Sequence, residues 1–325
     1  MPKLSRRLVA LASVALILFG TAACGSGTKA TGGDSPSVNV GTPIKGLTVT
    51  GKVGSAPSVK INTPLKVSKP ETHVSVVGKG HPVQAGKTAL LNLYLVDGTT
   101  GKKAASTYDS GFATQVTMDK SHLFKPLLKA LVGKPRGSRV EFAAPVKDIY
   151  GSKGATQYGL KPTDTVVFVT DIVSVPPTTT IQGPHGKQLT APADAPKVIE
   201  KNGNVTGFDW SKTPKSPPKK LTVIPLVKGD GPVARDQSIV TFNYFGEVWH
   251  GKKPFDESYT KKPIPFGVGV HQLIPAWDKA IPGLHLGSRV LIIAPPGDAY
   301  GSQARPGIPA NSTLAFVVDV VGVDD

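Results

Sequence analysis

Hydrophobic and polar positions alternate along the C-terminal part of the chain in the manner of β-strands. Residues 312–323 read STLAFVVDVVGV, which places Leu314, Phe316, Val318 and Val320 on one face, and residues 238–248 alternate in the same way. Residues 289–296, RVLIIAPP, form a short continuous apolar run of strand length. The pattern predicts an antiparallel sheet.

One short helix interrupts these strands. Pro275 suits the first position of a helix, and Ile274, Trp277 and Ile281 then recur at three- and four-residue spacing. Gly283 provides a stop. A single helix whose apolar stripe faces an antiparallel sheet predicts an α+β fold.

The same pattern occurs twice along the chain. Residues 121–140, SHLFKPLLKALVGKPRGSRV, are laid out like residues 271–290, HQLIPAWDKAIPGLHLGSRV, at an offset of 150 positions. Tyr94 and Tyr244 share that offset, and TVVFV at 165–169 matches TLAFV at 313–317 after a slip of two. A nearly constant offset over this length indicates two copies of one domain.

Composition divides the chain around these copies. The 325 residues are enough for two domains, and the 36 Gly and 30 Pro residues predict linkers and many turns. Residues 175–196 are rich in Pro, Thr and Gly and show little periodicity. We expect a signal segment at 1–24, a flexible tether at 25–60, a first domain at 61–176, a linker at 177–196 and a second domain at 197–325 with its core at 219–325.

The first segment has the layout of an export signal. Lys3, Arg6 and Arg7 precede an apolar run at 8–19 that is short for a permanent membrane span, and small residues lead to Cys24, the only cysteine. This end resembles a bacterial lipoprotein signal, which implies lipidation of Cys24 and a protein held at the extracytoplasmic face of the cell membrane. The alternative is ordinary signal cleavage beside an incidental cysteine.

The formal net charge of +16 favours anionic neighbours such as a membrane or a cell wall. Nucleic acid is a weaker interpretation, because the lysines are scattered, aromatic residues are few and no recognition helix or stacking motif occurs. No nucleophile or metal-ligand spacing stands out either, and we expect no cofactor.

The second copy carries an ordered set of aromatic and apolar residues, in the segments GKKPFDES, LIPAWDKAIPGLHLGSRVLIIAPPGDAYG and PGIPANSTLAFVVDVV. Over roughly residues 219–325 it resembles the FKBP-type peptidyl-prolyl cis–trans isomerases, and two such domains behind a lipoprotein signal resemble an actinobacterial exported protein. The resemblance implies two FKBP-like domains, each a curved antiparallel sheet wrapped around one short helix. It implies an apolar pocket for a proline ring formed by Tyr244, Phe255, Asp256, Phe266, Leu273, Ile274, Trp277, Tyr300, Ile308 and Phe316.

Roles in that pocket follow from the resemblance. Trp277 is expected at the floor, with Tyr244, Phe266 and Phe316 as walls, and the Ile274 backbone N–H is expected to bond the bound peptide. Asp256 and the Tyr300 hydroxyl are expected as polar contacts. Taken singly, each aromatic residue is as readily explained by core packing, so the interpretation depends on the ordered set.

The first copy lacks part of this set. Leu127 replaces Trp277, and Leu123-Phe124 replaces Leu273-Ile274, whereas Tyr94, Tyr150 and Phe168 match aromatic residues of the second copy. Tyr108-Asp109-Ser110 is a candidate for the Phe-Asp-Ser segment at a shifted loop length. We expect the same fold with a degraded pocket, suited to peptide binding, spacing or a structural role, and weak residual turnover is the alternative.

The leading hypothesis is a lipid-anchored isomerase that accelerates X–Pro isomerisation in exported polypeptides, with catalysis in the second domain. Macrolide inhibitors are further candidate ligands. The rival hypothesis is a non-catalytic, lipid-anchored module that binds peptides or acts as a chaperone.

Overall fold

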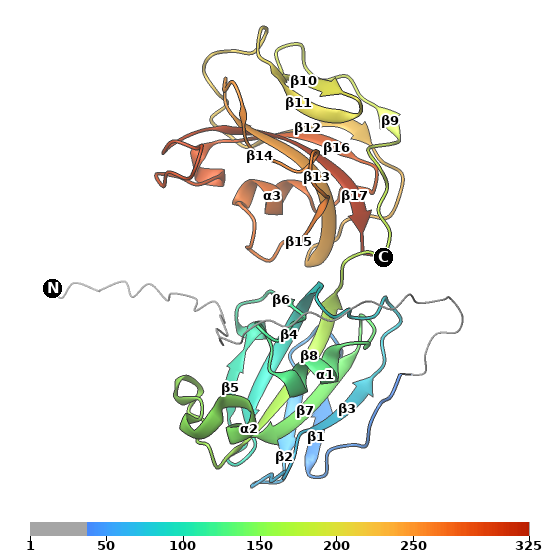
Figure 1. The fold of residues 1–325 in the computed structure, drawn as a ribbon, viewed down its shortest axis with the longest axis vertical. Helices are drawn as coiled ribbons and strands as arrows, with labels where there is room; N and C mark the ends of the chain where they lie inside the picture. The colour runs from blue at the N-terminus through green and yellow to red at the C-terminus, as the bar shows by residue number, and fades with distance from the viewer. Residues whose placement is uncertain (1–37, 325) are drawn as a thin grey trace, which may run out of the picture.

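The computed structural model describes residues 38–324, which form two sheet domains stacked along the long axis of the molecule (Figure 1). Each domain has an antiparallel sheet with one main helix against its inner face. The predicted α+β class and the predicted two copies of one domain are confirmed. Cys24 and the rest of the expected signal segment lie outside the described residues.

The first domain is a six-stranded sheet of order β3-β7-β8-β4-β5, with β6 also paired to β4. Helix α1 begins at Lys125, with Pro126 in its first turn, and directs Leu127 and Leu131 into the core. The elements are β1 (Leu47–Thr50), β2 (Ser58–Ile61), β3 (Glu71–Val76), β4 (Thr88–Asp97), β5 (Lys103–Ser106), β6 (Thr114–Thr117), α1 (Lys125–Leu131), β7 (Arg139–Pro145), α2 (Val146–Tyr150) and β8 (Thr165–Ser174).

The second domain is a sheet of order β14-β13-β17-β16-β12-β9, with β15 paired to β13. Its main helix is α3, which Pro275 begins as the sequence predicted. The elements are β9 (Lys187–Gln188), β10 (Lys197–Lys201), β11 (Asn204–Asp209), β12 (Thr222–Lys228), β13 (Ser238–Val248), β14 (Pro254–Glu257), β15 (Ile264–Val268), α3 (Pro275–Ala280), β16 (Arg289–Ala294) and β17 (Leu314–Val323).

Each sheet buries both faces. On the inner face, β13, β16 and β17 pack against α3 in one apolar cluster. On the outer face, Phe245, Leu291 and Val317 pack under the β10–β11 hairpin. Strands covered on both sides read as continuous apolar runs, which explains the RVLIIA sequence of β16.

The outer hairpins change the expected domain limits. Residues 47–60, expected in the tether, contain β1 and most of β2, which pair with each other and pack Val49 and Val59 on the outer face of the first sheet. Residues 187–188, expected in the linker, form β9 and pair with β12. Four- and two-residue strands are too short to show a period in the sequence.

The two domains are joined by direct contacts. Leu90 and Ala113 of the first domain form a buried apolar cluster with Ile239 and Val270 of the second. Ser174 accepts a hydrogen bond from the Ile239 backbone N–H (2.8 Å), and its hydroxyl donates to the Asp324 carboxylate.

Asp324, next to the C-terminus, adds further contacts between the two domains. Its Oδ2 accepts from the Val175 backbone N–H at 3.2 Å, and its Oδ1 lies 3.2 Å from the Arg136 guanidinium. The end of the second domain is therefore fastened to the first, and Figure 1 shows the C-terminus at the junction.

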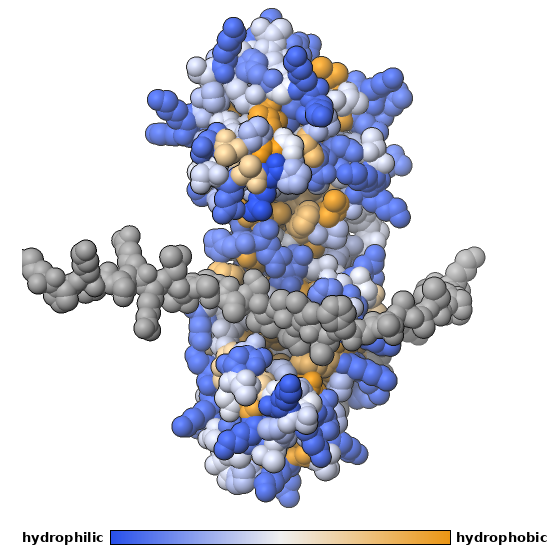
Figure 2. Space-filling view, turned by 60° about the vertical axis from the view of Figure 1, so that its left-hand side comes forward, coloured by the Kyte–Doolittle hydropathy of each residue, from blue (hydrophilic) through white to orange (hydrophobic). Residues whose placement is uncertain are grey.

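The surface is mainly polar on the face drawn in Figure 2, where hydrophobic side chains form only small patches on each domain. Within residues 38–324 no helix has the length and apolarity that crossing a bilayer requires.

Candidate active site

Trp277 lies at the centre of an aromatic cluster on the inner face of the second sheet. Its ring is nearly perpendicular to those of Phe242, Tyr244 and Phe316, with centroids 5.4, 5.4 and 5.5 Å away. Edge-to-face packing of this kind holds a ring in a defined orientation. Trp277 is 4% exposed, so it forms the base of the cluster.

The indole N–H of Trp277 is buried and has no hydrogen-bond partner among the described residues. Most buried donors in proteins are paired, so this one is an exception that needs an explanation. The rings packed around Trp277 offer this N–H no acceptor in the orientations they adopt.

Half-buried side chains surround this base. Ile308 and Phe316 are buried with Trp277 and Tyr244, whereas the other apolar residues predicted for the site keep part of their surface in solvent. The nine apolar or aromatic residues predicted for the site fall in a single cluster: Tyr244, Phe255, Phe266, Leu273, Ile274, Trp277, Tyr300, Ile308 and Phe316.

Asp256, the tenth predicted residue, lies at the exposed margin of the cluster. Its Oδ2 accepts a hydrogen bond from the Tyr244 hydroxyl, and its Oδ1 lies 3.3 Å from the Lys261 ammonium. Burial, followed by the hydrogen bond to Asp256, raises the pKa of Tyr244 above its ordinary value, so the phenol stays protonated at neutral pH. Because Lys261 is well exposed, its ion pair with Asp256 contributes little.

Sequence reasoning missed Asp278, which shapes the loop leading into α3. Its two carboxylate oxygens accept from the backbone N–H groups of Gly269 (2.8 Å) and His271 (3.1 Å). Both of these residues have positive φ, which costs a non-glycine residue conformational energy. Asp278 therefore fixes the turn that positions Leu273 and Ile274; an acidic residue in the first turn of a helix was the available signal.

Arg305 shapes the loop on the other side. Its guanidinium lies 5.5 Å from the ring centroid of Tyr300, a cation–π distance, and its backbone exchanges hydrogen bonds of 2.9 Å with Ile308. The turn at Gly307, with φ of +76°, passes close to Phe255. These contacts hold Ile308 against the aromatic cluster.

Backbone hydrogen bonds correct the alignment of the first copy. The Leu93 N–H donates to Thr107 Oγ1 at 2.9 Å, as the Tyr244 N–H donates to Ser258 Oγ at 2.9 Å. Leu93 therefore occupies the position of Tyr244. Tyr94, matched to Tyr244 by the sequence, packs in the cluster on the opposite face of the sheet.

The same comparison corrects the Tyr108-Asp109-Ser110 match. The Tyr108 hydroxyl donates to Asp171 at 2.6 Å, and the Tyr259 hydroxyl donates to Asp319 at 2.8 Å, so these two tyrosines correspond. The residues at the positions of Phe255 and Asp256 are then Ala104 and Ala105, because Leu95 pairs with Ala105 as Gly246 pairs with Asp256.

At the positions of Tyr244, Phe255 and Trp277, the inner cluster of the first domain therefore has aliphatic residues in place of aromatic ones. Leu127 is buried at the position of Trp277, and Tyr150 packs edge-on against Phe124 with centroids 4.9 Å apart. Burial raises the pKa of Tyr150. The degraded pocket expected for this copy is more altered than the sequence comparison indicated, because Tyr244, Phe255 and Asp256 also have no counterpart.

Metal chemistry has no evident location in the described part of the chain. Across residues 38–324, no three His, Cys, Asp or Glu side chains come together in an arrangement that could hold a metal ion.

Comparisons with known proteins agree with this arrangement of two copies. The model of the family "FKBP-type peptidyl-prolyl cis-trans isomerase" matches residues 80–173 and 231–321. "FK506-binding protein 3" of Yarrowia lipolytica is 39% identical over 125 residues, which is 36% of this chain and 30% of the relative. "Peptidyl-prolyl cis-trans isomerase" of Saccharomyces cerevisiae is 42% identical over 95 residues, or 29% of this chain and 23% of the relative.

Among solved structures, the 3 FKBP domains of wheat FKBP73 share 18% identity, covering 78% of this chain and 94% of that one with a TM-score of 0.33. The AtFKBP13 structure shares 30% identity over 34% of this chain and 97% of that one, with a TM-score of 0.30. The chain spans less than a third of the length of the two curated relatives above. Both regions matched by the family model are the sheet domains described above, and the chain belongs to the FKBP-type peptidyl-prolyl cis-trans isomerase family.

Proposed function

We propose that the second domain catalyses cis–trans isomerisation of X–Pro bonds and that its pocket is the aromatic cluster around Trp277. The observation that carries this proposal is a buried indole surrounded by apolar side chains that are only half-buried. A closed core would have no reason to keep Phe255, Phe266 and Tyr300 partly in solvent.

The groups present in this cluster are sufficient for isomerisation of an X–Pro bond. An X–Pro bond rotates over a barrier of about 18–20 kcal/mol, which comes from lost amide resonance, and no bond is made or broken. An apolar pocket removes water that stabilises the planar, charge-separated amide, and it can fit the twisted amide better than either planar form. Each ~1.4 kcal/mol of that preference gives a tenfold gain in rate.

Polar groups at the margin would orient the peptide. Ile274 caps α3, so its N–H precedes the hydrogen-bond ladder of the helix and can donate to a substrate carbonyl. Asp256 and the Tyr300 hydroxyl flank the cluster as further polar contacts. The names of the relatives mention FK506, and we extend macrolide binding to this pocket as part of the proposal.

The test is a proline-limited refolding assay with the full chain. Trp277→Leu should lower kcat/KM at least roughly tenfold, because the pocket loses its base. The matched control is Leu127→Ile in the first domain, which should leave the rate unchanged. Equal rates for Trp277→Leu and the unaltered chain would remove the catalytic assignment.

We further propose export and lipid anchoring through Cys24, on the sequence of residues 1–24 alone. Clients would then be proline-containing polypeptides at the extracytoplasmic face of the membrane. Cells grown with labelled palmitate should label the unaltered protein and not the Cys24→Ala variant; equal labelling of both would contradict the anchor.

A second candidate function, peptide binding without turnover, applies to the first domain. Its inner cluster retains Phe168 and Tyr150 but has leucine or alanine at four pocket positions, namely those of Tyr244, Phe255, Asp256 and Trp277.

A further inference from the structure

The outer face of each sheet carries the same buried group of three side chains. In the first domain Arg139 pairs with Asp171, which also accepts from Tyr108. In the second domain Arg289 pairs with Asp319, which also accepts from Tyr259. Both arginine side chains are at least nine-tenths buried. Burial opposes the charge on Arg289, but the hydrogen bonds and charge of Asp319 outweigh it and raise the pKa of Arg289.

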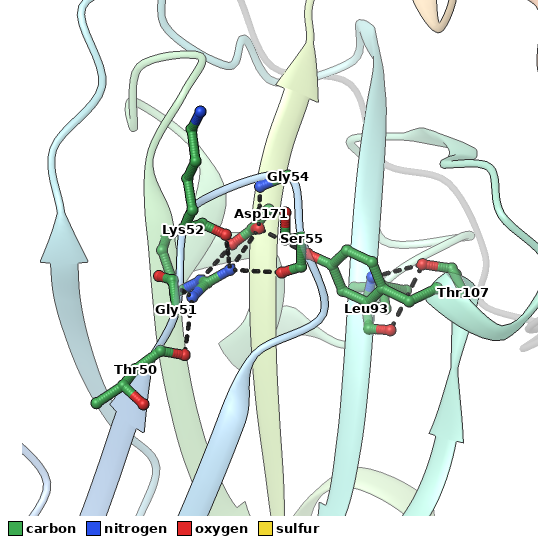
Figure 3. Close-up of polar contacts among 10 residues, drawn as sticks. Thr50, Gly51, Lys52, Gly54, Ser55, Leu93, Thr107 and Asp171 are labelled. Carbon is green, nitrogen blue, oxygen red and sulfur yellow. Dashed lines mark hydrogen bonds and ion pairs between the residues drawn. The ribbon is translucent and has the colours of Figure 1, made fainter.

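In the first domain a loop of the chain itself covers this group. Residues 51–57 join β1 to β2, and the Arg139 guanidinium donates to the carbonyl oxygens of Gly51 (2.9 Å), Lys52 (3.1 Å) and Ser55 (3.1 Å). The Gly54 N–H donates to Asp171 at 2.7 Å. Figure 3 shows these loop residues gathered over Asp171. The pair therefore binds a polypeptide turn through its backbone alone.

In the second domain the corresponding hairpin has a turn of only two residues, Asn202 and Gly203, between β10 and β11. Besides its bonds to Asp319, the Arg289 guanidinium donates from Nη1 to the Glu200 carboxylate. That carboxylate side chain is 43% exposed.

A cleft of about 880 Å³ lies where the longer loop lies in the first domain. Arg289, Glu200 and Tyr259 line it together with the connector residues Gln182 and Gly183. Arg289 and Leu291 point to the outer face, whereas their neighbour Val290 packs toward α3, so the cleft is on the opposite side of the sheet from Trp277.

We propose that this cleft is a second binding site, which takes a turn of a partner polypeptide through its backbone carbonyls. Arg289 would donate to the carbonyls, as Arg139 does for residues 51–57. Glu200 competes for Arg289 and is displaced on binding. Recognition through the backbone makes the site tolerant of sequence, and it operates independently of the isomerase pocket.

The probe is a head-to-tail cyclised peptide of residues 47–61, labelled with fluorescein. It carries Pro57→Ala so that it offers no X–Pro bond to the other site. Titration of the full chain, followed by fluorescence anisotropy, should give saturable binding. Glu200→Ala should tighten binding roughly tenfold, because it removes a charge-assisted competitor of Arg289. Lys201→Ala, an exposed neighbour on the same strand, is the matched control and should leave binding unchanged.

The decisive variant replaces residues 202–203 with the seven residues 51–57. This graft should fill the cleft and abolish peptide binding while the refolding activity is retained, which shows that the domain is folded. The proposal is overturned if neither the unaltered chain nor Glu200→Ala binds the peptide. Undiminished binding by an active graft would overturn it as well. These outcomes are separate from those at Trp277, since both variants are expected to keep isomerase activity.

Discussion

The two domains share a scaffold and differ in what occupies its two faces. On the inner face, the first domain places Leu93 and Leu127 where the second places Tyr244 and Trp277. On the outer face, residues 51–57 cover the arginine–aspartate pair of the first domain, and the second leaves a cleft there. The Arg–Asp–Tyr group is common to both domains, so the domains differ in what covers this group on the outer face and in which side chains fill the inner face.

The largest expected loss of stability comes from a substitution on the outer face. Arg139→Ala removes the partner of a fully buried aspartate and also leaves the loop carbonyls without donors. Breaking a buried pair from one side typically costs about 3–5 kcal/mol. Arg289→Ala should lower the free energy of unfolding by a smaller amount, because it leaves only Asp319 and the exposed Glu200 without their partner. Urea denaturation of both variants measures the difference, and equal losses would mean that the loop contributes nothing through Arg139.

The inner face offers a second comparison. Leu127→Trp introduces the missing indole into the first domain, where the surrounding cluster is already filled. We expect a destabilisation of about 1–3 kcal/mol from overpacking and no gain in isomerase rate. The rate is measured in the double variant Leu127→Trp with Trp277→Leu, in which the second domain is inactive. A faster rate than that of Trp277→Leu alone would show that the first domain lacks only the indole.

Alkaline pH should weaken the first domain through Tyr150. Burial raises the pKa of this tyrosine above its ordinary value of 10.0, with a smaller contribution from Tyr158. The unfolded chain therefore releases the proton first, so the stabilisation is complete below about pH 10 and is lost as pH rises beyond it. The slope per tyrosine is at most about 1.4 kcal/mol per pH unit.

Tyr150→Phe should flatten that part of the pH dependence without removing it, since Tyr108 and Tyr259 also have raised pKa values. Urea denaturation at pH 8 and pH 11 measures the change. An unchanged slope in Tyr150→Phe would show that this phenol is accessible to hydroxide in the folded state.

The smallest effect concerns the junction. Gln115 Oε1 accepts from the Gly267 N–H at 2.8 Å, next to Phe266 of the pocket wall. Gln115→Ala should cost about 1 kcal/mol of stability. It should also raise KM more than it lowers kcat, because the wall is less well held. Thr117→Ala, on the same strand and without this contact, is the control.

Sequence reasoning grouped the residues of the inner aromatic cluster because they occur in ordered motifs at nearly fixed spacing, and the structure gathers the nine apolar or aromatic ones in one cluster. It misplaced Tyr94 because a constant offset of 150 does not hold in β4, and it misplaced Tyr108 because the Tyr-Asp-Ser triplet looked like the Phe-Asp-Ser segment at a shifted loop length. In β4, Asn92 and Asp171 pair as Asn243 and Asp319 do, one position away from that offset.

The outer hairpins were missed for a different reason. Strands of four residues show too little alternation of apolar and polar positions to be distinguished, in the sequence, from a tether that contains Gly and Pro. Their position is determined by Arg139, which donates to three backbone carbonyls of the loop and to both carboxylate oxygens of Asp171, and these partners lie far apart in sequence. No local pattern encodes such a contact.

The hydrogen bond between Gln115 and Gly267 has a consequence for how this protein can be divided. Within residues 38–324, strand β15 pairs on one side only, with β13, so its other side is an open edge of the kind that recruits strands from other molecules. The first domain shields that edge with a single amide side chain and the apolar residues beside it. Separating the halves would expose this strand edge, and the isolated C-terminal half should self-associate more strongly than the intact chain.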